Sequence, residues 1–311
     1  MAAVLTDKVL TCVSRLDEVL LGKSHQIRLA VTCLLAGGHL LIEDLPGMGK
    51  TTLAHALARV FGLQDTRVQF TSDMLPADLL GISIFESSTG RFVFHPGPIF
   101  CQLLLADEIN RTTPKTQSAL LEAMEEGQVT LEGMTHSLPE PFFVIATQNP
   151  LTQFGTFPLP ESQLDRFLMR IALGYPDPAS ERQLLMRGGE RQGGNISSVL
   201  TPEELLQARS DSQGIHVSAD LIHYLQRLVQ FTRDSDDFSQ GVSPRGALAV
   251  LRCAKSWAWL HKRHHVVPED IQAVLPAVIG HRVRRSDDVG GQSAEFLVEQ
   301  LLRQVDVLPS K

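Results

Sequence analysis

Short apolar runs alternate with amphipathic stretches through roughly the first 175 residues of this 311-residue chain. The runs have the length of buried strands, and the stretches between them repeat their apolar positions at helical spacing. Strands are predicted at His39–Glu43, Arg67–Phe70, Gln102–Ala106, Phe142–Ala146 and Met169–Leu173. Helices are predicted over residues 50–62, 115–126 and 160–168. Strands separated by helices in this way predict a parallel sheet that is covered on both faces.

Two segments interrupt this alternation and are typical of β-hairpins. Ile82–His95 has two alternating arms around a polar turn at residues 87–90. Gly127–Leu138 turns near Glu132 and Gly133. Both hairpins are therefore predicted to be insertions into the α/β domain.

The pattern changes near Tyr175–Pro178, and beyond it only helical patterns occur. They cover residues 178–188, 202–210, 218–233, 244–264, 268–279 and 293–304. The polar loop Asp234–Gly241 separates two of them. We therefore predict an α/β domain over residues 1–175 that carries the two hairpins, followed by a smaller all-helical domain over residues 176–311.

Composition and cysteine content narrow the class of protein. The chain is 43% hydrophobic and 20% charged, which is typical of a globular protein, and no apolar run reaches the roughly 18 residues of a transmembrane helix. Near the N-terminus, charged residues interrupt the apolar positions at helical spacing, which predicts an amphipathic helix rather than a signal peptide. The four cysteines lie far apart and form no CxxC pair. This argues against a zinc site or a disulfide framework and favours a cytoplasmic location.

The charge distribution argues against a general nucleic-acid surface. The formal net charge is −7, whereas nucleic-acid binding depends on clustered basic residues that displace counterions. The most basic segment, residues 281–285, is followed at once by Asp287 and Asp288. We expect this segment to be a charged surface of the helical domain or a contact with a neighbouring subunit.

A glycine-rich turn between a predicted strand and a predicted helix has the features of a phosphate-binding loop. It is formed by Pro46, Gly47, Met48, Gly49, Lys50, Thr51 and Thr52. Gly47 and Gly49 let successive N–H groups point at a polyphosphate, and the helix directs its positive end at the same place. Lys50 supplies a cation to the β- and γ-phosphates, and the Thr51 hydroxyl is a Mg²⁺ ligand. Asp44 replaces the first glycine of the GxxxxGK[ST] pattern, so its carboxylate must point away from the phosphates.

Two further predicted strands end in polar side chains. Asp107 and Glu108 end one strand, and Asn149 follows another. Because ligands of open α/β sheets bind at the carboxyl ends of the strands, these side chains are expected near the phosphate loop. Asp107 is placed to hold Mg²⁺, directly or through water, and Glu108 to polarise the attacking water. Asn149 can orient the water or the γ-phosphate, or it can form an Asn-Pro turn, or both.

Three segments closely resemble the MoxR group of AAA+ ATPases: Asp107–Thr130, Pro141–Pro150 and Gly155–Phe167. The resemblance extends from about Leu20 to the end of the chain. It implies a P-loop AAA+ three-layer sandwich with a parallel sheet, followed by an all-helical lid domain. Departures from the family pattern are few: besides Asp44, they are Gly127, Thr152 and Phe154.

The resemblance also implies a role for each candidate residue. It places adenine at Leu21 and Gly22, and it makes residues 46–52 the Walker A loop and residues 104–108 the Walker B strand. Glu108 is then the catalytic base and Asn149 is sensor 1. Arg166 matches the arginine finger that completes the site of the adjacent subunit, with Arg170 ranked second. Arg245 matches the sensor 2 arginine at the start of a lid helix.

The function that this resemblance implies is an ATP-hydrolysing ring, taken as hexameric, that remodels or activates partner proteins. Proteins with a von Willebrand factor A domain are the expected partners, and the hairpin tips are the expected client surfaces. A nucleic-acid-associated AAA+ motor is an alternative, which would need basic or aromatic residues at those tips. A small-molecule kinase or nucleotide switch is another, but such a protein needs neither a helical lid nor a finger from a neighbour.

Overall fold

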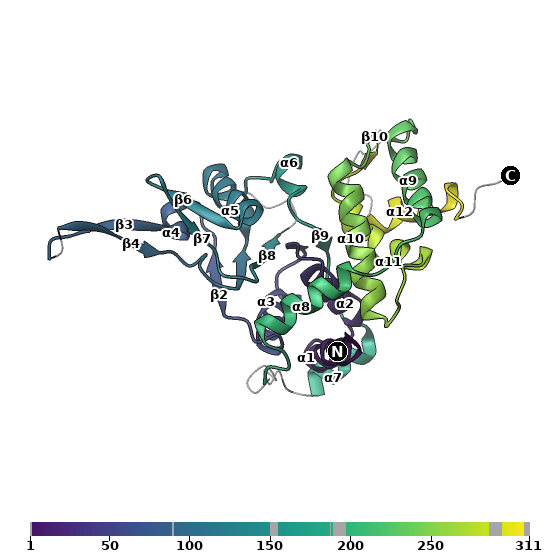
Figure 1. The fold of residues 1–311 in the computed structure, drawn as a ribbon, viewed down its shortest axis with the longest axis horizontal. Coiled ribbons are helices and arrows are strands. Elements are labelled where there is room, and N and C mark those ends of the chain that lie inside the picture. The colour runs from purple at the N-terminus through teal and green to yellow at the C-terminus, as the bar shows by residue number, and fades with distance from the viewer. Residues whose placement is uncertain are drawn as a thin grey trace.

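A parallel five-stranded sheet forms the centre of the molecule (Figure 1). The structure, a computed structural model, describes residues 2–88, 90–149, 155–186, 188, 197–285 and 294–307. The strand order is β2-β5-β8-β1-β9, and each neighbouring pair is parallel. The strands are β1 (Leu40–Glu43), β2 (Asp65–Gln69), β5 (Leu103–Asp107), β8 (Phe143–Gln148) and β9 (Met169–Ile171). All five predicted strands are confirmed, and their bounds differ from the prediction by two residues at most.

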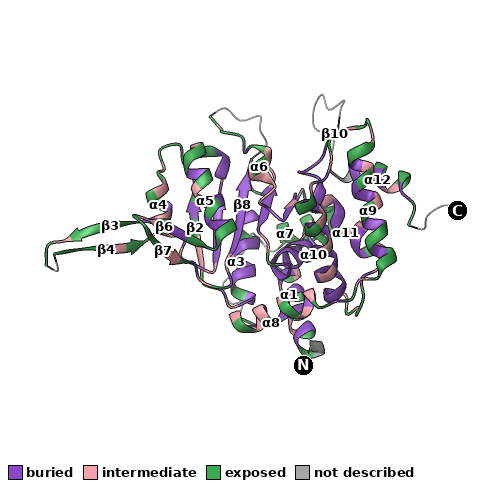
Figure 2. Cartoon of the chain, turned by 45° about the horizontal axis from the view of Figure 1, so that its top comes forward, coloured by how far each residue is buried: buried purple, intermediate pink, exposed green. Residues whose placement is uncertain are grey.

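Both faces of the sheet are buried, which explains why the strands are continuous apolar runs. Alternate residues of β1, β5 and β8 belong to two different hydrophobic clusters. One cluster joins Leu40, Leu103 and Phe143 to helices of the N-terminal and lid regions. The other joins Leu104 and Val144 to the helix that precedes the second hairpin. In Figure 2 the central strand β8 is buried along its length, between helices on either side.

Six α-helices accompany the sheet in the described part of the N-terminal region. They are α1 (Ala2–Val19), α2 (Ser24–Leu35), α3 (Lys50–Val60), α4 (Pro76–Leu80), α5 (Pro114–Glu126) and α6 (Glu161–Leu164). The prediction of α3 and α5 is confirmed. The prediction of a helix over residues 160–168 is wrong for its second half, because α6 ends at Leu164. There the chain turns toward the sheet, and the Leu168 N–H donates to the His39 carbonyl at 2.8 Å. No helix in the described residues is long and apolar enough to cross a membrane.

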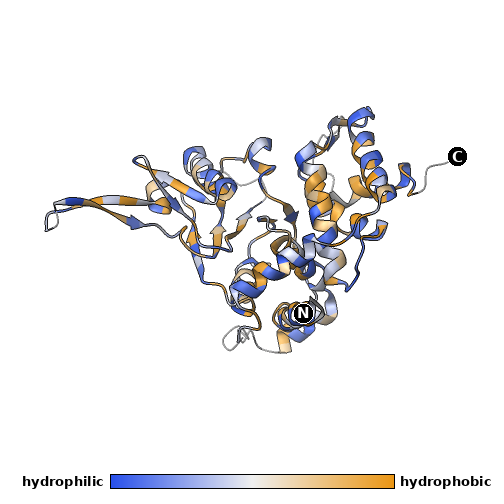
Figure 3. Cartoon of the chain, in the orientation of Figure 1, coloured by the Kyte–Doolittle hydropathy of each residue, from blue (hydrophilic) through white to orange (hydrophobic). Residues whose placement is uncertain are grey.

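The C-terminal region is built mainly from helices, as predicted. They are α7 (Pro178–Met186), α8 (Pro202–Gln213), α9 (Ala219–Asp234), α10 (Pro244–Leu260), α11 (Pro268–Ile279) and α12 (Ala294–Gln304). Figure 3 shows hydrophobic positions gathered along α10 and α11. The helix predicted over residues 244–264 ends at Leu260 because Lys262 takes a left-handed backbone, with φ 59°.

Helices are not the only elements of this region. Strands β10 (Phe238–Gln240) and β11 (Arg284–Arg285) pair antiparallel, so the prediction of helical patterns alone is wrong. These strands are too short to show alternation, and their backbone groups satisfy one another across two loops. The prediction of a charged surface at residues 281–285 is also wrong in part, since His281 and Arg282 are buried. The domain boundary near residue 175 stays a prediction, because α1 and α2 share a hydrophobic cluster with α8, α10 and α11.

Both predicted hairpins are confirmed. The first is formed by β3 (Gly81–Glu86) and β4 (Arg91–Pro96), and it projects from the body of the molecule (Figure 1). The second is formed by β6 (Gln128–Leu131) and β7 (Met134–Ser137), with left-handed residues at its turn. The hairpins touch near their bases, where the rings of Phe94 and His136 stack at 4.0 Å.

Gly81→Ala should destabilise the protein more than Gly90→Ala. Both glycines have a positive φ, of 102° and 67°, so both substitutions strain the backbone. A Cβ at Gly81 would also lie 2.4 Å from the His95 carbonyl oxygen, whereas nothing lies within 4 Å of a Cβ at Gly90. We expect urea unfolding to show a loss above about 2 kcal/mol for Gly81→Ala and of about 1 kcal/mol for Gly90→Ala. Equal losses would mean that the contact with β4 does not require glycine.

Candidate functional site

The phosphate-loop candidate lies between β1 and α3, as the sequence predicts. Gly47 and Gly49 have φ of 87° and 92°, values that strain any side chain with a Cβ. A Cβ at Gly47 would meet nothing within 4 Å, so this glycine is required by its backbone conformation rather than by lack of space. Thr51 and Thr52 lie in the first turn of α3, which begins at Lys50. Half-buried Met48 packs against the larger hydrophobic cluster, while Pro46 is exposed.

Asp44 is turned away from the glycine loop. Its Oδ2 accepts a hydrogen bond from the Gly174 N–H at 2.6 Å, and its Oδ1 accepts one from the Leu45 N–H at 2.8 Å. Its carbonyl oxygen accepts a hydrogen bond from Lys50 Nζ at 2.7 Å. The Asp44 carboxylate thus links the start of the loop to the chain beyond β9 by a hydrogen bond. The expectation that it points away from the phosphate site is confirmed.

Asn149 links Lys50 to Glu108. Its side-chain oxygen accepts from Lys50 Nζ at 3.3 Å, and its nitrogen donates to Glu108 Oε1 at 2.9 Å. Lys50 is only 8% exposed. Burial lowers the pKa of Lys50, while Asp44, Asp107 and Glu108 act against that decrease. The two hydrogen bonds of Lys50 Nζ go to neutral oxygens, of the Asp44 carbonyl and the Asn149 amide, rather than to a carboxylate.

Asp107 and Glu108 are held by side chains of the two neighbouring strands. Asp107 Oδ1 accepts from the Thr147 hydroxyl and its Oδ2 from Arg67, both at 2.6 Å. The Thr147 oxygen also accepts from the Glu108 N–H at 2.9 Å. Glu108 is left-handed, with φ 58°, a conformation that a residue with a Cβ keeps only when its surroundings hold it. Thr147 supplies part of that support.

The remaining oxygen of Glu108 is also occupied. Its Oε2 accepts from Gln69 Nε2 at 3.0 Å and lies 2.8 Å from Arg111 Nε. Sequence reasoning missed the contributions of Arg67, Gln69 and Thr147 to this cluster. Strand order brings them there. Thr147 directly follows a predicted strand, whereas Arg67 and Gln69 lie within one and have no local signal.

The segment predicted to hold adenine lies beside the glycine loop. A Cβ at Gly49 would be 3.7 Å from Leu20, and Leu21 and Gly22 form the turn between α1 and α2. Gly22 has φ 72°, and a Cβ there would lie 2.6 Å from Asp177 Oδ2. The turn between the first two helices therefore meets the start of α7.

The two predicted trans-acting and lid arginines lie together. Arg166 Nε is 3.2 Å from Glu125 Oε2, and Arg245 pairs with the other oxygen of Glu125. Arg245 is also 3.9 Å from Asp165 Oδ2. Arg170, the second candidate for the finger, instead donates to Glu43 Oε2 at 3.0 Å and to the Gly280 carbonyl at 2.7 Å. Arg166 and Arg245 thus form one charged group at the end of α5, while Arg170 joins the sheet to the lid.

The oxygen donors of Thr51 and Asp107 fit the chemistry of Mg²⁺. This hard cation takes oxygen ligands and is usually held by one or two protein groups together with substrate phosphates. Asp107 already accepts a hydrogen bond from the cationic side chain of Arg67. Within the described residues, no group of three or more His, Cys, Asp and Glu side chains could hold a metal ion alone.

Comparisons with known proteins identify the family. The ATPase family associated with various cellular activities (AAA) matches residues 39–169, and the AAA lid domain matches residues 230–301. Chaperone MoxR1 of Mycobacterium tuberculosis is 36% identical over 93% of this chain and 79% of its own length. The chain belongs to the MoxR family of AAA+ ATPases.

Other similarities cover nearly the whole of this MoxR-family chain. Protein YeaC of Bacillus subtilis is 42% identical over 95% of this chain and 93% of its own length. The crystal structure of a candidate ATPase from Cytophaga hutchinsonii superposes with a TM-score of 0.89 at 35% identity. That similarity covers 98% of this chain and 96% of the other. The nucleotide-binding fold with its lid is therefore that of an AAA+ ATPase.

Thr147→Val should reduce ATP turnover by about 10- to 100-fold, since it removes the hydroxyl that supports Asp107 and Glu108. Valine has nearly the same shape but lacks the hydroxyl, and this loss can also cost stability in a buried strand. A urea midpoint close to that of the unmodified protein assigns the lost turnover to the site. Thr147→Ser keeps the hydroxyl and is the matched control, with turnover expected near that of the unmodified protein. Steady-state release of phosphate measures both. Normal turnover in Thr147→Val would exclude this support.

Proposed function

We propose that this chain binds and hydrolyses ATP as one subunit of a ring. The observation that carries the proposal is the bridge that Asn149 makes between Lys50 and Glu108. A cation for the phosphates and a carboxylate for the attacking water are thereby held at one edge of the sheet. The Walker A residues Pro46–Thr52 provide the phosphate site, with adenine beside Leu21 and Gly22.

Each residue has a distinct part in the proposed hydrolysis. Lys50 neutralises charge on the β- and γ-phosphates, and Asn149 orients the γ-phosphate or the water. Glu108 polarises the attacking water as the general base. Thr51 and Asp107 would hold Mg²⁺, which would neutralise part of the charge of the phosphates.

Arg166 and Arg245 are proposed to serve the nucleotide of a neighbouring subunit. Both contact Glu125 rather than the cluster around Lys50. They come from different regions of the chain, and Arg245 is half exposed. A finger of this kind contributes about 10³–10⁵ to the rate in other phosphoryl-transfer systems. Hydrolysis would then depend on assembly of a ring, which we take to be hexameric.

The proposed work of the ring is to remodel partner proteins in the cytoplasm, with von Willebrand factor A domain proteins as the expected partners. The β3–β4 hairpin supports this proposal, because it projects from the body and exposes Ile84, Phe85 and Phe92. Exposed apolar side chains of this kind are typical of protein-binding surfaces. A nucleotide-dependent change in the position of the hairpin would convert hydrolysis into force on a client.

A nucleic-acid motor has less support from this hairpin. Phe85 and Phe92 are exposed aromatic residues near the tip, which bases could stack on. Arg91, the basic residue beside them, lies opposite Glu86 in the strand register, so its charge is offset and the tip is not a basic surface. Salt-dependent binding of single-stranded DNA by the purified protein would nevertheless favour the motor over the remodeller.

Glu108→Gln should bind ATP with nearly normal affinity and lose turnover by at least about 100-fold, because the amide cannot act as a general base. Glutamine keeps the size of the side chain and an acceptor for Asn149. Glu122→Gln, an exposed change on α5, is the matched control and should hydrolyse ATP normally. Binding of a fluorescent ATP analogue and release of phosphate measure the two effects.

The same Glu108→Gln protein should act as a trap for the client. Loaded with ATP, it should retain a von Willebrand factor A domain protein that the ADP-loaded protein releases. Undiminished turnover would exclude Glu108 as the base. Retention of the client protein without ATP would exclude control of client binding by the nucleotide.

Arg166→Ala and Lys50→Ala should each silence a uniform ring, and an equal mixture of the two should recover part of the hydrolysis. In a mixed ring, an Arg166→Ala subunit supplies an intact nucleotide site and a Lys50→Ala subunit supplies its finger. Arg59→Ala, an exposed change on α3, is the control and should remain active alone. Lack of recovery in the mixture would contradict a finger that acts between subunits.

A further inference from the structure

Arg282 is a buried arginine that the function proposed above leaves unused. It lies beyond α11 in the basic segment at residues 281–285, and its side chain is only 4% exposed. By contrast, Arg284, two residues on, has a largely exposed side chain paired with Glu161 at 2.8 Å. A guanidinium is costly to bury unless its donors and its charge are satisfied, so the contacts of Arg282 need an explanation.

Most of these contacts are with the segment that carries Arg166. Arg282 Nε donates to Asp165 Oδ1 at 2.6 Å, and the second terminal nitrogen donates to the carbonyls of Asp165 at 3.0 Å and Phe167 at 2.7 Å. The first terminal nitrogen donates to the Leu168 carbonyl at 3.2 Å and to the Val278 carbonyl of α11. Backbone oxygens on both sides of Arg166 are thus held by one side chain.

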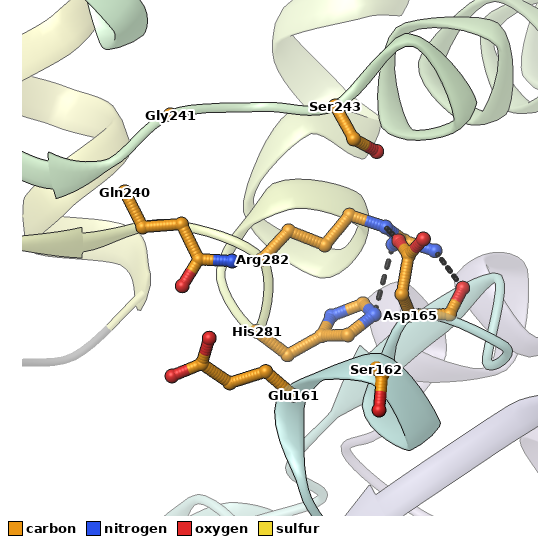
Figure 4. A pocket seen from close by; sticks show the side chains of 8 residues that line it. All are labelled: Glu161, Ser162, Asp165, Gln240, Gly241, Ser243, His281 and Arg282. Atoms are coloured by element: carbon orange, nitrogen blue, oxygen red, sulfur yellow. Dashed lines mark hydrogen bonds and ion pairs between the residues drawn. The ribbon is translucent and has the colours of Figure 1, made fainter.

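His281 lies against the same group, and its neutral Nε2 can either accept from Arg282 or donate to the Phe167 carbonyl. Its Nε2 lies 3.1 Å from the Phe167 carbonyl and 2.8 Å from the first terminal nitrogen of Arg282. Burial and the charge of Arg282 keep the pKa of His281 well below its ordinary value, so the imidazole stays neutral beside the guanidinium. Figure 4 shows Arg282 joined to both Asp165 and His281, and all three residues line a cavity of about 290 Å³.

The stem of Arg282 also meets the start of the lid helix that carries Arg245. A Cβ at Gly246 would lie 3.1 Å from Arg282 Cδ and 2.8 Å from Val242 Cγ1. Glycine after Arg245 therefore leaves room for the Arg282 side chain. Arg282 is thus in contact with the surroundings of both arginines that share Glu125.

We infer that Arg282 is a positioning residue, which fixes the backbone at residues 165–168 so that Arg166 reaches the nucleotide of the neighbouring subunit. This inference rests on the proposed role of Arg166 and assigns its support to the lid. A lysine could not replace Arg282, because an ammonium has three donors at one point, whereas the guanidinium spreads five over a plane. Small displacements of a reacting group reduce rates steeply, so a loosened finger segment should lose most of its effect.

The test places Arg282→Gln in only one partner of the mixed ring described above. In the Lys50→Ala subunit, which donates the finger, it should lower the recovered hydrolysis by about 10- to 100-fold. In the Arg166→Ala subunit, which donates the nucleotide site, it should change the recovered hydrolysis by less than about twofold, because the finger of that subunit is already absent. Activity of this second mixture also demonstrates that the Arg282→Gln chain folds and assembles.

Three further variants keep the test specific. Arg282→Lys retains the charge and should fail in the finger donor as Arg282→Gln does. Arg284→Gln should have no effect in either subunit. Arg209→Gln, which removes a different, half-buried arginine bound to the Leu34 carbonyl, should affect both placements alike through stability.

The outcomes separate this inference from the function on which it rests. Equal losses of hydrolysis in both placements of Arg282→Gln would mean that Arg282 has only a general structural role. No loss in the finger-donating subunit would mean that Arg282 does not position Arg166. Either result overturns the inference. If the mixture of Arg166→Ala and Lys50→Ala subunits recovers no hydrolysis while Arg282 is intact, the proposed action of Arg166 between subunits is itself contradicted. Position-dependent loss, with recovery in the unmodified mixture, is the expected result.

Discussion

The side chain of Asn149 holds a buried cation and a carboxylate together, and the candidate site is arranged around this bridge. Lys50 and Glu108 follow different strands, and they are neighbours only because β1, β8 and β5 lie side by side in parallel. Burial of the Lys50 ammonium is tolerable because acceptors surround it. The same constraint explains why Asp44 must face away, since a further carboxylate toward the loop would fill the place of the phosphate.

The strands and the phosphate loop could be predicted because their signals are local. A strand that is buried on both faces is a continuous apolar run, and a loop that requires positive φ needs glycines, as at Gly47 and Gly49. The proposed roles of Asp107, Glu108 and Asn149 rest on their positions after predicted strands, and that of Lys50 rests on the glycine-rich loop. The structure brings these four together as predicted, whereas it places Arg166 and Arg245 on a shared carboxylate that the sequence did not suggest.

What the sequence could not predict depends on contacts between distant segments. Thr147 and Arg67 reach Asp107 because β8 and β2 flank β5, and strand order has no local signature. Strands β10 and β11 are too short for their alternation to be visible. Arg282 was misjudged because a run of basic residues usually lies in solvent, and only the packing of the lid on residues 165–168 shows otherwise.

A residue proposed to act between subunits needs a side chain that can change partner and a backbone that stays fixed. Arg166 and Arg245 have exchangeable ion pairs, whereas Arg282 holds the backbone. Arg166, Arg245 and Arg282 share the carboxylates of Glu125 and Asp165, so positive charge exceeds negative charge there. Partly exposed ion pairs such as those with Glu125 contribute little stability, and a triphosphate offers more charge and better acceptors. These pairs can therefore be exchanged for a nucleotide at little cost. The buried bonds of Arg282 cannot be exchanged so easily, so they would keep the backbone in place during the proposed change of partner by the Arg166 side chain.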